Sequence, residues 1–142
     1  MELEGKIYKD GKFWLVEIPG LDAMTQGKTR KDAVAMTKDL VLEMVASYFP
    51  DEAATLKITI TDYEKNLIGI TTSDTKLLLA LSLRRQREAS GSTLKKAAER
   101  LGSKSPNSYA QYEKGETSIS IEQFEHLLVA ANPHGRRRLR LV

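Results

Sequence analysis

Apolar and polar residues alternate along the first half of the chain, and this period of two predicts β-strands. In the run at residues 13–18, Trp14, Val16 and Ile18 fall on one face of the predicted strand. An Asp10-Gly11 pair separates this run from residues 2–9, which indicates a hairpin because both turn positions adopt positive φ easily. Further strands are predicted at residues 24–27, 56–61 and 67–72.

Apolar residues recur at helical spacing in the other segments. A long helix is predicted to begin after Thr29, whose spacing to Asp32 is typical of a capping box, and to end near Tyr48. Beyond residue 72 short helices are predicted at residues 75–88, 94–101, 106–113 and 120–131. In the last of them we expect an inward-facing stripe of Ile121, Phe124, Leu127, Leu128 and Ala131. The order β-β-β-α-β-β followed by helices predicts an α+β protein.

The chain of 142 residues has room for two small domains, and its charge divides in the same way. Residues 1–72 hold nine Lys and Arg against twelve Asp and Glu, a net charge of −3. Residues 73–142 hold thirteen against seven, a net charge of +6. We therefore predict two domains, 1–72 and 73–142, and expect only the second to meet nucleic acid.

The absence of cysteine excludes a disulfide scaffold, a thiol nucleophile and a cysteine-ligated zinc site. We expect His126 and His134 to be surface or helix-end residues, so no metal site and no cofactor is implied. No apolar run approaches the roughly 20 residues needed to span a bilayer. The first residues also lack the basic-then-apolar order of a secretion signal. We therefore expect a cytoplasmic protein with no membrane partner.

The first domain carries a resemblance to a known family. The residues concerned are Phe13-Trp-Leu-Val-Glu-Ile-Pro-Gly-Leu, then Thr25-Gln-Gly-Lys-Thr, then Asp32-Ala33 opening a helix. Their order and spacing resemble the N-terminal domain of HicB-type antitoxins over residues 1–60. The resemblance implies a partial RNase H-like fold and a HicA-like toxin as partner, a small basic protein that cleaves mRNA. A domain with a net negative charge suits a basic partner.

An RNase H-like nuclease would need several carboxylates that converge on two metal ions. The carboxylates of the first domain that come into question are Glu17, Asp22, Asp32, Asp39, Asp51, Asp62 and Glu64. Most of them fall on turns or on the solvent side of the predicted helix, and no pair has an obvious common focus. Neither histidine lies near a nucleophile signal, so a Ser-His-Asp triad has no support. We therefore predict that the chain is not an enzyme and has no catalytic residues.

The short helices of the second domain resemble the helix-turn-helix domain of the Xre, Cro and lambda-repressor type. Ala98 stands where that family has a small residue for close packing of the second helix on the third, and Gly102 ends the second helix. The third helix continues as Tyr109-Ala-Gln-Tyr-Glu-Lys-Gly115, similar to the family pattern that ends in Glu-x-Gly. We expect Tyr109 to pack inward. The resemblance covers residues 75–131 and implies an all-α domain that binds operator DNA.

The predicted recognition helix carries polar residues that suit DNA. Asn107, Ser108 and Gln111 share one side of it, and Asn and Gln can each form two hydrogen bonds with adenine. Lys104 and Lys114 flank the helix and can bind phosphates. The complete set of predicted DNA-binding residues is Ser92, Thr93, Lys104, Ser105, Asn107, Ser108, Gln111 and Lys114. The first two stand where the family usually has a glutamine that touches phosphate.

The last residues, His134-Gly-Arg-Arg-Arg-Leu-Arg-Leu-Val142, alternate arginine and leucine, which predicts a short strand. A terminal strand needs a partner. Pairing with the same strand of a second copy would suit a dimer that reads a palindromic operator. A disordered basic arm is the alternative.

Together these patterns predict an antitoxin, present as a homodimer or higher homo-oligomer. The first domain would bind and block a HicA-like toxin, and the second would repress the chain's own operon by binding operator DNA. Two other interpretations stay open: a stand-alone repressor whose first domain senses a small ligand, and a metal-dependent nuclease. A neighbouring gene for a small basic toxin favours the antitoxin. RNA cleavage that depends on Glu17 or Asp62 favours the nuclease.

Overall fold

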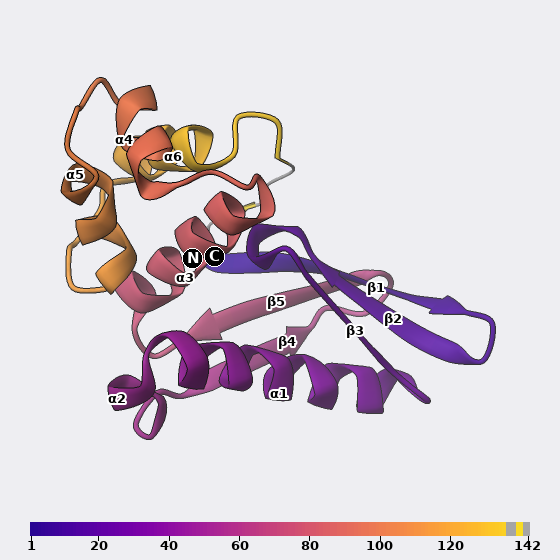
Figure 1. Cartoon of the computed structure of the whole chain (residues 1–142). Coiled ribbons are helices and arrows are strands. Elements are labelled where there is room, and N and C mark those ends of the chain that lie inside the picture. Colours follow the sequence, from indigo (N-terminus) through magenta and orange to yellow (C-terminus); the bar gives the residue numbers. More distant parts are fainter. Residues whose placement is uncertain (136–138, 141–142) are drawn as a thin grey trace. The chain divides into compact units, whose positions relative to one another are not determined.

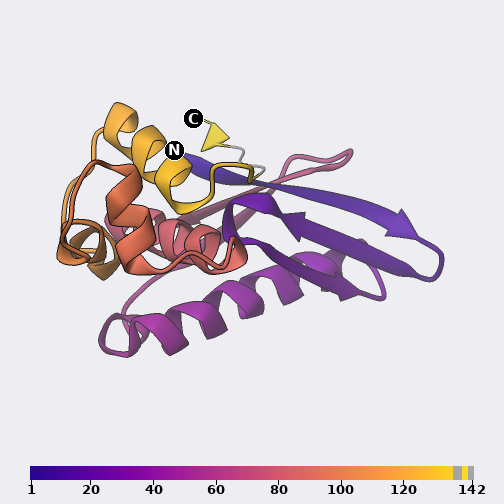
Figure 2. The same ribbon diagram turned by 45° about the horizontal axis from the view of Figure 1, so that its top comes forward.

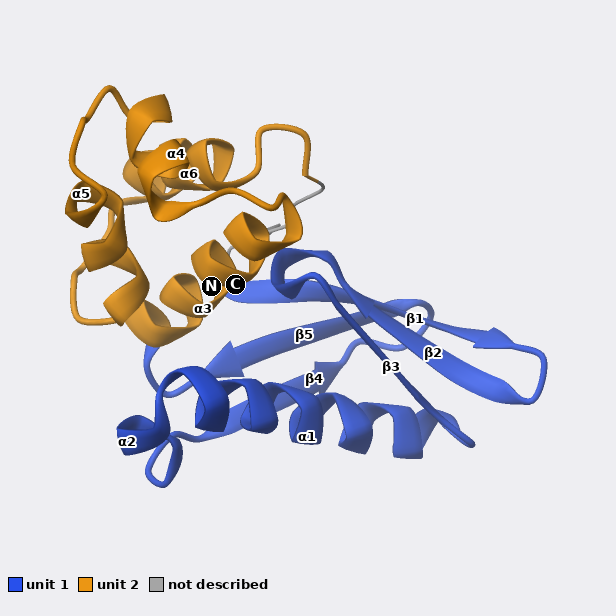
Figure 3. Cartoon of the chain, viewed as in Figure 1, with its two compact units in different colours: residues 1–74, 137–142 blue, residues 75–136 orange. Residues whose placement is uncertain are grey.

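The computed structural model of the chain describes residues 1–135 and 139–140 (Figure 1). The chain divides into two compact units, Met1–Asp74 with Arg137–Val142 as unit 1 and Thr75–Arg136 as unit 2 (Figure 3). The division therefore follows Asp74, two residues beyond the predicted boundary. The terminal segment is grouped with unit 1, whereas the sequence analysis placed it in the second domain.

Unit 1 is an antiparallel sheet with one long helix along one face (Figure 2). Its strands are β1 (Glu2–Asp10), β2 (Phe13–Ile18), β3 (Ala23–Gly27), β4 (Ile58–Asp62), β5 (Leu67–Thr72) and β6 (Leu139–Arg140). They pair in the order β3-β2-β1-β5-β4, and β6 pairs with β1. The other elements are η1 (Pro19–Leu21), α1 (Arg30–Tyr48) and α2 (Pro50–Ala53). The predicted order β-β-β-α-β-β is confirmed.

The strand register shows which face of the sheet α1 covers. Ile7 of β1 pairs with Val16 of β2, and both side chains are fully buried. Trp14 and Ile18 lie on the same face as Val16, because alternate residues of a strand point the same way. The Arg30 guanidinium, at the start of α1, lies 5.5 Å from the centre of the Trp14 ring. The face predicted to be apolar is therefore the one that packs against α1.

The start of α1 is set by its cap and by a glycine. The Asp32 backbone N–H donates to the Thr29 hydroxyl oxygen at 3.0 Å, which confirms Thr29 as the cap. Gly27, at the end of β3, lets the helix approach closely. A Cβ at Gly27 would lie only 2.3 Å from the backbone nitrogen of Ala33. The close packing of β3 on α1 therefore depends on a residue without a side chain.

An ion pair joins the start of α1 to the end of β4. Arg30 Nη2 lies 2.7 Å from Asp62 Oδ1, and Arg30 Nε lies 2.9 Å from Asp62 Oδ2. The hydrogen bonds to Arg30 lower the pKa of Asp62, and those to Asp62 raise the pKa of Arg30. Asp62, one of the carboxylates considered for a nuclease, thus has a structural partner.

The terminal strand pairs within the chain. β6 runs antiparallel to β1, with Arg140 opposite Glu2. β2 pairs with β1 only from Lys6 onward, so the first residues of β1 present an edge that β6 occupies. The prediction of a strand is confirmed at residues 139–140, and its partner is β1 of the same chain, whereas the sequence had left open a second copy or a disordered arm. The rest of the predicted alternation, at positions 138 and 141, lies outside the described residues.

This grouping changes the charge of each unit. Unit 1, with Arg137–Val142 included, holds twelve Lys and Arg against thirteen Asp and Glu, a net charge of −1. Unit 2 holds ten against six, a net charge of +4. The contrast between −3 and +6 that the sequence suggested is therefore smaller in the folded units, mainly because arginines near the C-terminus belong to unit 1.

Unit 2 consists of helices. They are α3 (Thr75–Ala89), α4 (Leu94–Arg100), α5 (Asn107–Ala110), η2 (Gln111–Lys114) and α6 (Ile121–Ala131). The helix predicted at residues 106–113 is thus α5 continued by a 3-10 turn. Of the inward stripe predicted on α6, Phe124, Leu127, Leu128 and Ala131 are buried. Ile121 is 61% exposed, so that prediction is wrong: it is the first residue of α6, one turn before the first buried position.

Candidate nucleic-acid interface

The helices α4 and α5 of unit 2 are joined by a turn at residues 101–106. At the start of α4, the Lys96 backbone N–H donates to the Thr93 hydroxyl oxygen at 3.0 Å. After its end, Gly102 has a φ of +83° and donates its N–H to the Glu99 carbonyl oxygen at 2.9 Å. Glycine adopts this left-handed conformation without steric cost. The predicted end of the second helix at Gly102 is confirmed.

The inner side of the α5–η2 segment is anchored to α6. Tyr109 has no exposed surface, and its hydroxyl donates to the Leu127 carbonyl oxygen at 3.1 Å. Burial raises the pKa of Tyr109, so it remains a neutral donor. Gln123 Nε2 donates to the Tyr112 hydroxyl oxygen at 2.7 Å. The prediction that Tyr109 packs inward is confirmed.

A second anchor joins α5–η2 to α3. Arg87 Nε lies 2.9 Å and 3.1 Å from the two carboxylate oxygens of Glu113, and the side chains are only 14% and 8% exposed. Desolvation raises the pKa of Glu113, although the Arg87 hydrogen bond opposes this shift. The sequence analysis did not predict this pair. The only signal for it was the Glu of the Glu-x-Gly pattern.

The outer side of the segment carries the predicted base-reading residues. Asn107 and Gln111 are exposed, and Ser108 is half-buried. Ser108 Oγ donates to the Ser105 carbonyl oxygen at 2.7 Å. Gln111 Nε2 donates to the Ser108 carbonyl oxygen at 3.3 Å, a long bond that a base edge can replace. The structure therefore presents two amide side chains on a helix whose opposite side is fixed.

Exposed cationic and hydroxyl side chains stand before and after α5–η2 and at the start of α4. Lys104 and Ser105 lie exposed in the turn before α5, and Lys114 lies exposed at the end of η2. Lys95 and Lys96 are also exposed, in the first turn of α4. These two were not among the predicted residues, although their place at the start of the predicted helix 94–101 was visible in the sequence. Such side chains can bind phosphates on either side of a groove.

One of the two residues at the position of the family's glutamine, Ser92, does not lie at the surface. Ser92 is only 8% exposed, and its hydroxyl oxygen accepts a hydrogen bond from Arg100 Nη1 at 2.8 Å. The same Nη1 donates to the Ala130 carbonyl oxygen at 2.8 Å. The structure therefore contradicts Ser92 as a surface contact, because this hydroxyl is buried and bonds to Arg100 in a partly buried network that reaches α6. Thr93 is exposed, and its hydroxyl oxygen caps α4.

Two of the carboxylates considered for a nuclease, Glu17 and Asp62, have hydrogen-bonded partners within unit 1. Tyr8 donates its hydroxyl proton to Glu17 Oε1 at 2.7 Å, and this bond raises the pKa of Tyr8. Asp62 pairs with Arg30, as described above. Among the described residues, no group of three or more His, Asp or Glu is arranged to hold a metal ion. No helix in the same part of the chain is both long and apolar enough to cross a membrane.

Comparison with known proteins identifies the helical unit. No curated protein and no solved structure matches the chain. Residues 83–129 match the helix-turn-helix family. This segment begins within α3 and ends within α6, so it includes α4, the turn and the α5–η2 segment. The chain therefore contains a helix-turn-helix domain in unit 2, which points to DNA binding and regulation of transcription.

Proposed function

We propose that the chain is a repressor that binds operator DNA through residues 104–114 of unit 2. The observation that carries this proposal is the two-sided character of α5–η2. Tyr109 and Glu113 hold its inner side, whereas Asn107 and Gln111 are exposed on its outer side. The major groove of DNA admits a helix of this kind and presents distinct donors and acceptors to its side chains.

Five residues of the segment have a proposed role. Asn107 and Gln111 bond to base edges, with adenine as the preferred base because its N6 and N7 match a carboxamide. Lys104, Ser105 and Lys114 bind phosphates and position the helix. The net charge of +4 on unit 2 supports this assignment, since phosphate contacts supply much of the affinity of DNA-binding proteins.

Fluorescence anisotropy of the full chain on its own operon's promoter, at several salt concentrations, tests this function. Gln111→Ala is expected to reduce the preference for promoter over unrelated DNA by about 1–3 kcal/mol. Lys104→Ala is expected to weaken binding to both DNAs equally and to lower the salt slope by about one. Gln26→Ala and Lys38→Ala, at exposed positions of unit 1, are the matched controls. Absence of salt-dependent binding to the promoter would refute the repressor.

We further propose that unit 1 binds and neutralises a basic HicA-like toxin, as the resemblance to HicB-type antitoxins implies. The support is the sheet face that points away from α1. Phe13, Leu15 and Met24 lie on this face, and Phe13 is 41% and Met24 61% exposed. Asp10 pairs with Phe13, and Glu17 pairs with Met24. Carboxylates next to exposed apolar side chains suit a partner that brings both cations and apolar groups.

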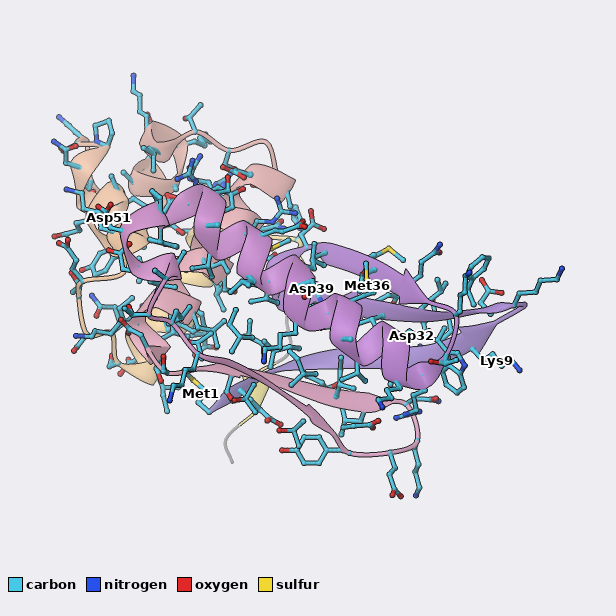
Figure 4. The ribbon with its side chains drawn as sticks, turned by 90° about the horizontal axis from the view of Figure 1, so that it is seen from below. Met1, Lys9, Asp32, Met36, Asp39 and Asp51 are labelled. Atoms are coloured by element: carbon cyan, nitrogen blue, oxygen red, sulfur yellow. The ribbon has the colours of Figure 1, made fainter. Side chains whose placement is uncertain are left out.

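The partial RNase H-like fold belongs to this same proposal, and the order of strands and helix supports it. Co-expression with the product of the neighbouring gene tests the antitoxin through copurification and rescue of growth. Phe13→Glu and Met24→Glu are expected to abolish copurification and rescue. Met36→Glu, on the outer side of α1 and 45% exposed, is the control that should keep both (Figure 4). If the neighbouring product neither inhibits growth nor copurifies, the antitoxin is refuted, and a small ligand becomes the alternative for unit 1.

The proposal assigns the chain no catalytic role, no cofactor and no membrane partner. Glu17 and Asp62 are treated as structural carboxylates because each has a hydrogen-bonded partner. Incubation of the purified chain with RNA and Mg²⁺ or Mn²⁺ checks this assignment. Cleavage that is lost in Asp62→Asn would contradict it.

A further inference from the structure

Unit 2 has large exposed apolar side chains outside residues 104–114. Among the described residues of this unit, the large apolar side chains more than a third exposed are Leu101 at 38%, Ile121 at 61% and Val129 at 45%. Ile121 and Val129 lie two turns apart on α6 and flank the outer side of that helix. Contiguous apolar exposure marks a surface that binds another molecule.

Two of these side chains line one groove. Leu101, at the end of α4, and Val129, on α6, line a groove with a volume of about 600 Å³. The two helices lie side by side in unit 2 (Figure 1). Arg100, Glu125 and His126 form the polar part of the lining. The groove therefore has apolar walls and groups of both charge signs.

We propose that this groove is the surface through which two copies of the chain form a dimer. A two-fold interface must be complementary to itself, so a patch that carries both a cation and a carboxylate meets the requirement. In such a dimer Val129 and Leu101 of the two copies bury one another, and Glu125 of each copy faces Arg100 or His126 of the other. Arg100 uses Nη1 for its bonds to Ser92 and Ala130, which leaves Nε and Nη2 as donors for a carboxylate.

This inference rests on the proposed repressor function, because helix-turn-helix dimers read two half-sites of a palindrome. The terminal strand pairs with β1 of its own chain, so it is not the strand-to-strand contact that the sequence suggested. Neither Asn107 nor Gln111 lines the α4–α6 groove. A dimer formed there therefore uses no side chain of the proposed DNA-binding segment in its contact.

The chain contains no cysteine, so single cysteines give a specific crosslinking test on the full chain. Val129→Cys is expected to form a covalent dimer with a bismaleimide reagent at micromolar concentration. Met36→Cys, which replaces a residue with the same exposed fraction of 45%, is the matched control and is expected to stay monomeric on denaturing gels. Equal crosslinking of the two variants would overturn the proposal.

Analytical ultracentrifugation provides the second measurement. The unmodified chain is expected to be a dimer at micromolar concentration, and Val129→Glu is expected to weaken dimerisation by about tenfold or more, as for loss of an interface anchor. Circular dichroism confirms that this variant is folded. A monomeric wild type, or a Val129→Glu variant that dimerises normally, would refute the groove as the interface. Val129→Glu should still bind a DNA with a single half-site. Failure of the proposed interface is therefore distinguishable from failure of the repressor function, because in the second case the wild type binds no promoter DNA.

Discussion

The buried ion pair between Arg87 and Glu113 leads to a quantitative prediction for unit 2. Glu113→Ala removes the carboxylate and leaves the Arg87 guanidinium, 14% exposed, without its ionic partner. Removing one member of a buried pair costs about 3–5 kcal/mol. Arg87 keeps its hydrogen bond to the Ser92 carbonyl oxygen at 3.0 Å. The expected loss in the free energy of unfolding is therefore at the lower end, ~3 kcal/mol.

A loss of this size is large for a small unit. Globular domains have about 0.05–0.15 kcal/mol of stability per residue. A unit of about 60 residues therefore has roughly 3–9 kcal/mol in total. Glu113 also belongs to the segment that we propose reads DNA, so the variant is expected to lose operator affinity together with stability.

Urea unfolding followed by far-UV circular dichroism measures the loss. Glu99→Ala is the matched control, because the Glu99 carboxylate is 45% exposed and lies 3.9 Å from Lys96. Its expected effect is within about 0.5 kcal/mol. Replacing the buried pair with Arg87→Met and Glu113→Leu together is expected to recover most of the lost stability. A Glu113→Ala effect no larger than that of Glu99→Ala would refute the conclusion that this pair holds η2 to α3.

Three further predictions concern the backbone and the exposed ion pair. Arg30 lowers the pKa of Asp62 in the folded state, so the pair stabilises the folded protein at pH values above the ordinary pKa of the carboxyl. This contribution is lost as the pH falls through the lowered pKa. Asp62→Asn should therefore flatten the acid side of the stability profile in urea titrations and cost under about 1 kcal/mol at pH 7. Gly27→Ala places a Cβ 2.3 Å from the Ala33 backbone nitrogen and is expected to cost about 1–3 kcal/mol in thermal unfolding; a neutral result would contradict the close approach of α1. At Gly102 an alanine side chain would have open space, but the residue has a φ of +83°. Backbone strain alone should therefore make Gly102→Ala less stable by about 1–2 kcal/mol. An unchanged melting temperature would show that the turn relaxes.

The elements were predictable where their signals act over a few residues. The hairpin signal at Asp10-Gly11, the cap at Thr29 and the break at Gly102 each depend on atoms within about one helical turn or hairpin. The structure has the cap and the break. It also has the hairpin, but its turn residues are Gly11 and Lys12, one position later than the predicted pair, because Asp10 pairs with Phe13. Ile121 was assigned inward from helical spacing alone, but spacing does not show where the neighbouring elements end.

The candidate site divides in the same way. The exposed residues between 104 and 114 followed from the family pattern and from polarity along one short segment. The burial of Ser92 did not, because it depends on Arg100 and on the Ala130 carbonyl, which is far from Ser92 in sequence. The pair of Arg87 and Glu113 was missed for the same reason, since its members stand 26 positions apart and meet only when α3 packs on η2.

By itself the sequence determined the strand and helix order and the two-domain organisation in outline, because periodicity, caps and turns are local properties of the chain. The helix-turn-helix segment was identified by its resemblance to a family pattern, which is also read along a short stretch of sequence. Only the tertiary structure decided the partner of the terminal strand, since the first residues of β1 offer an edge that no local pattern reveals. With the terminal segment, arginines that the sequence analysis counted in the second domain belong to unit 1. The net charges of unit 1 and unit 2 are therefore −1 and +4. The same holds for the groove between α4 and α6: its apolar side chains are ordinary in the sequence and become a surface only when the two helices pack.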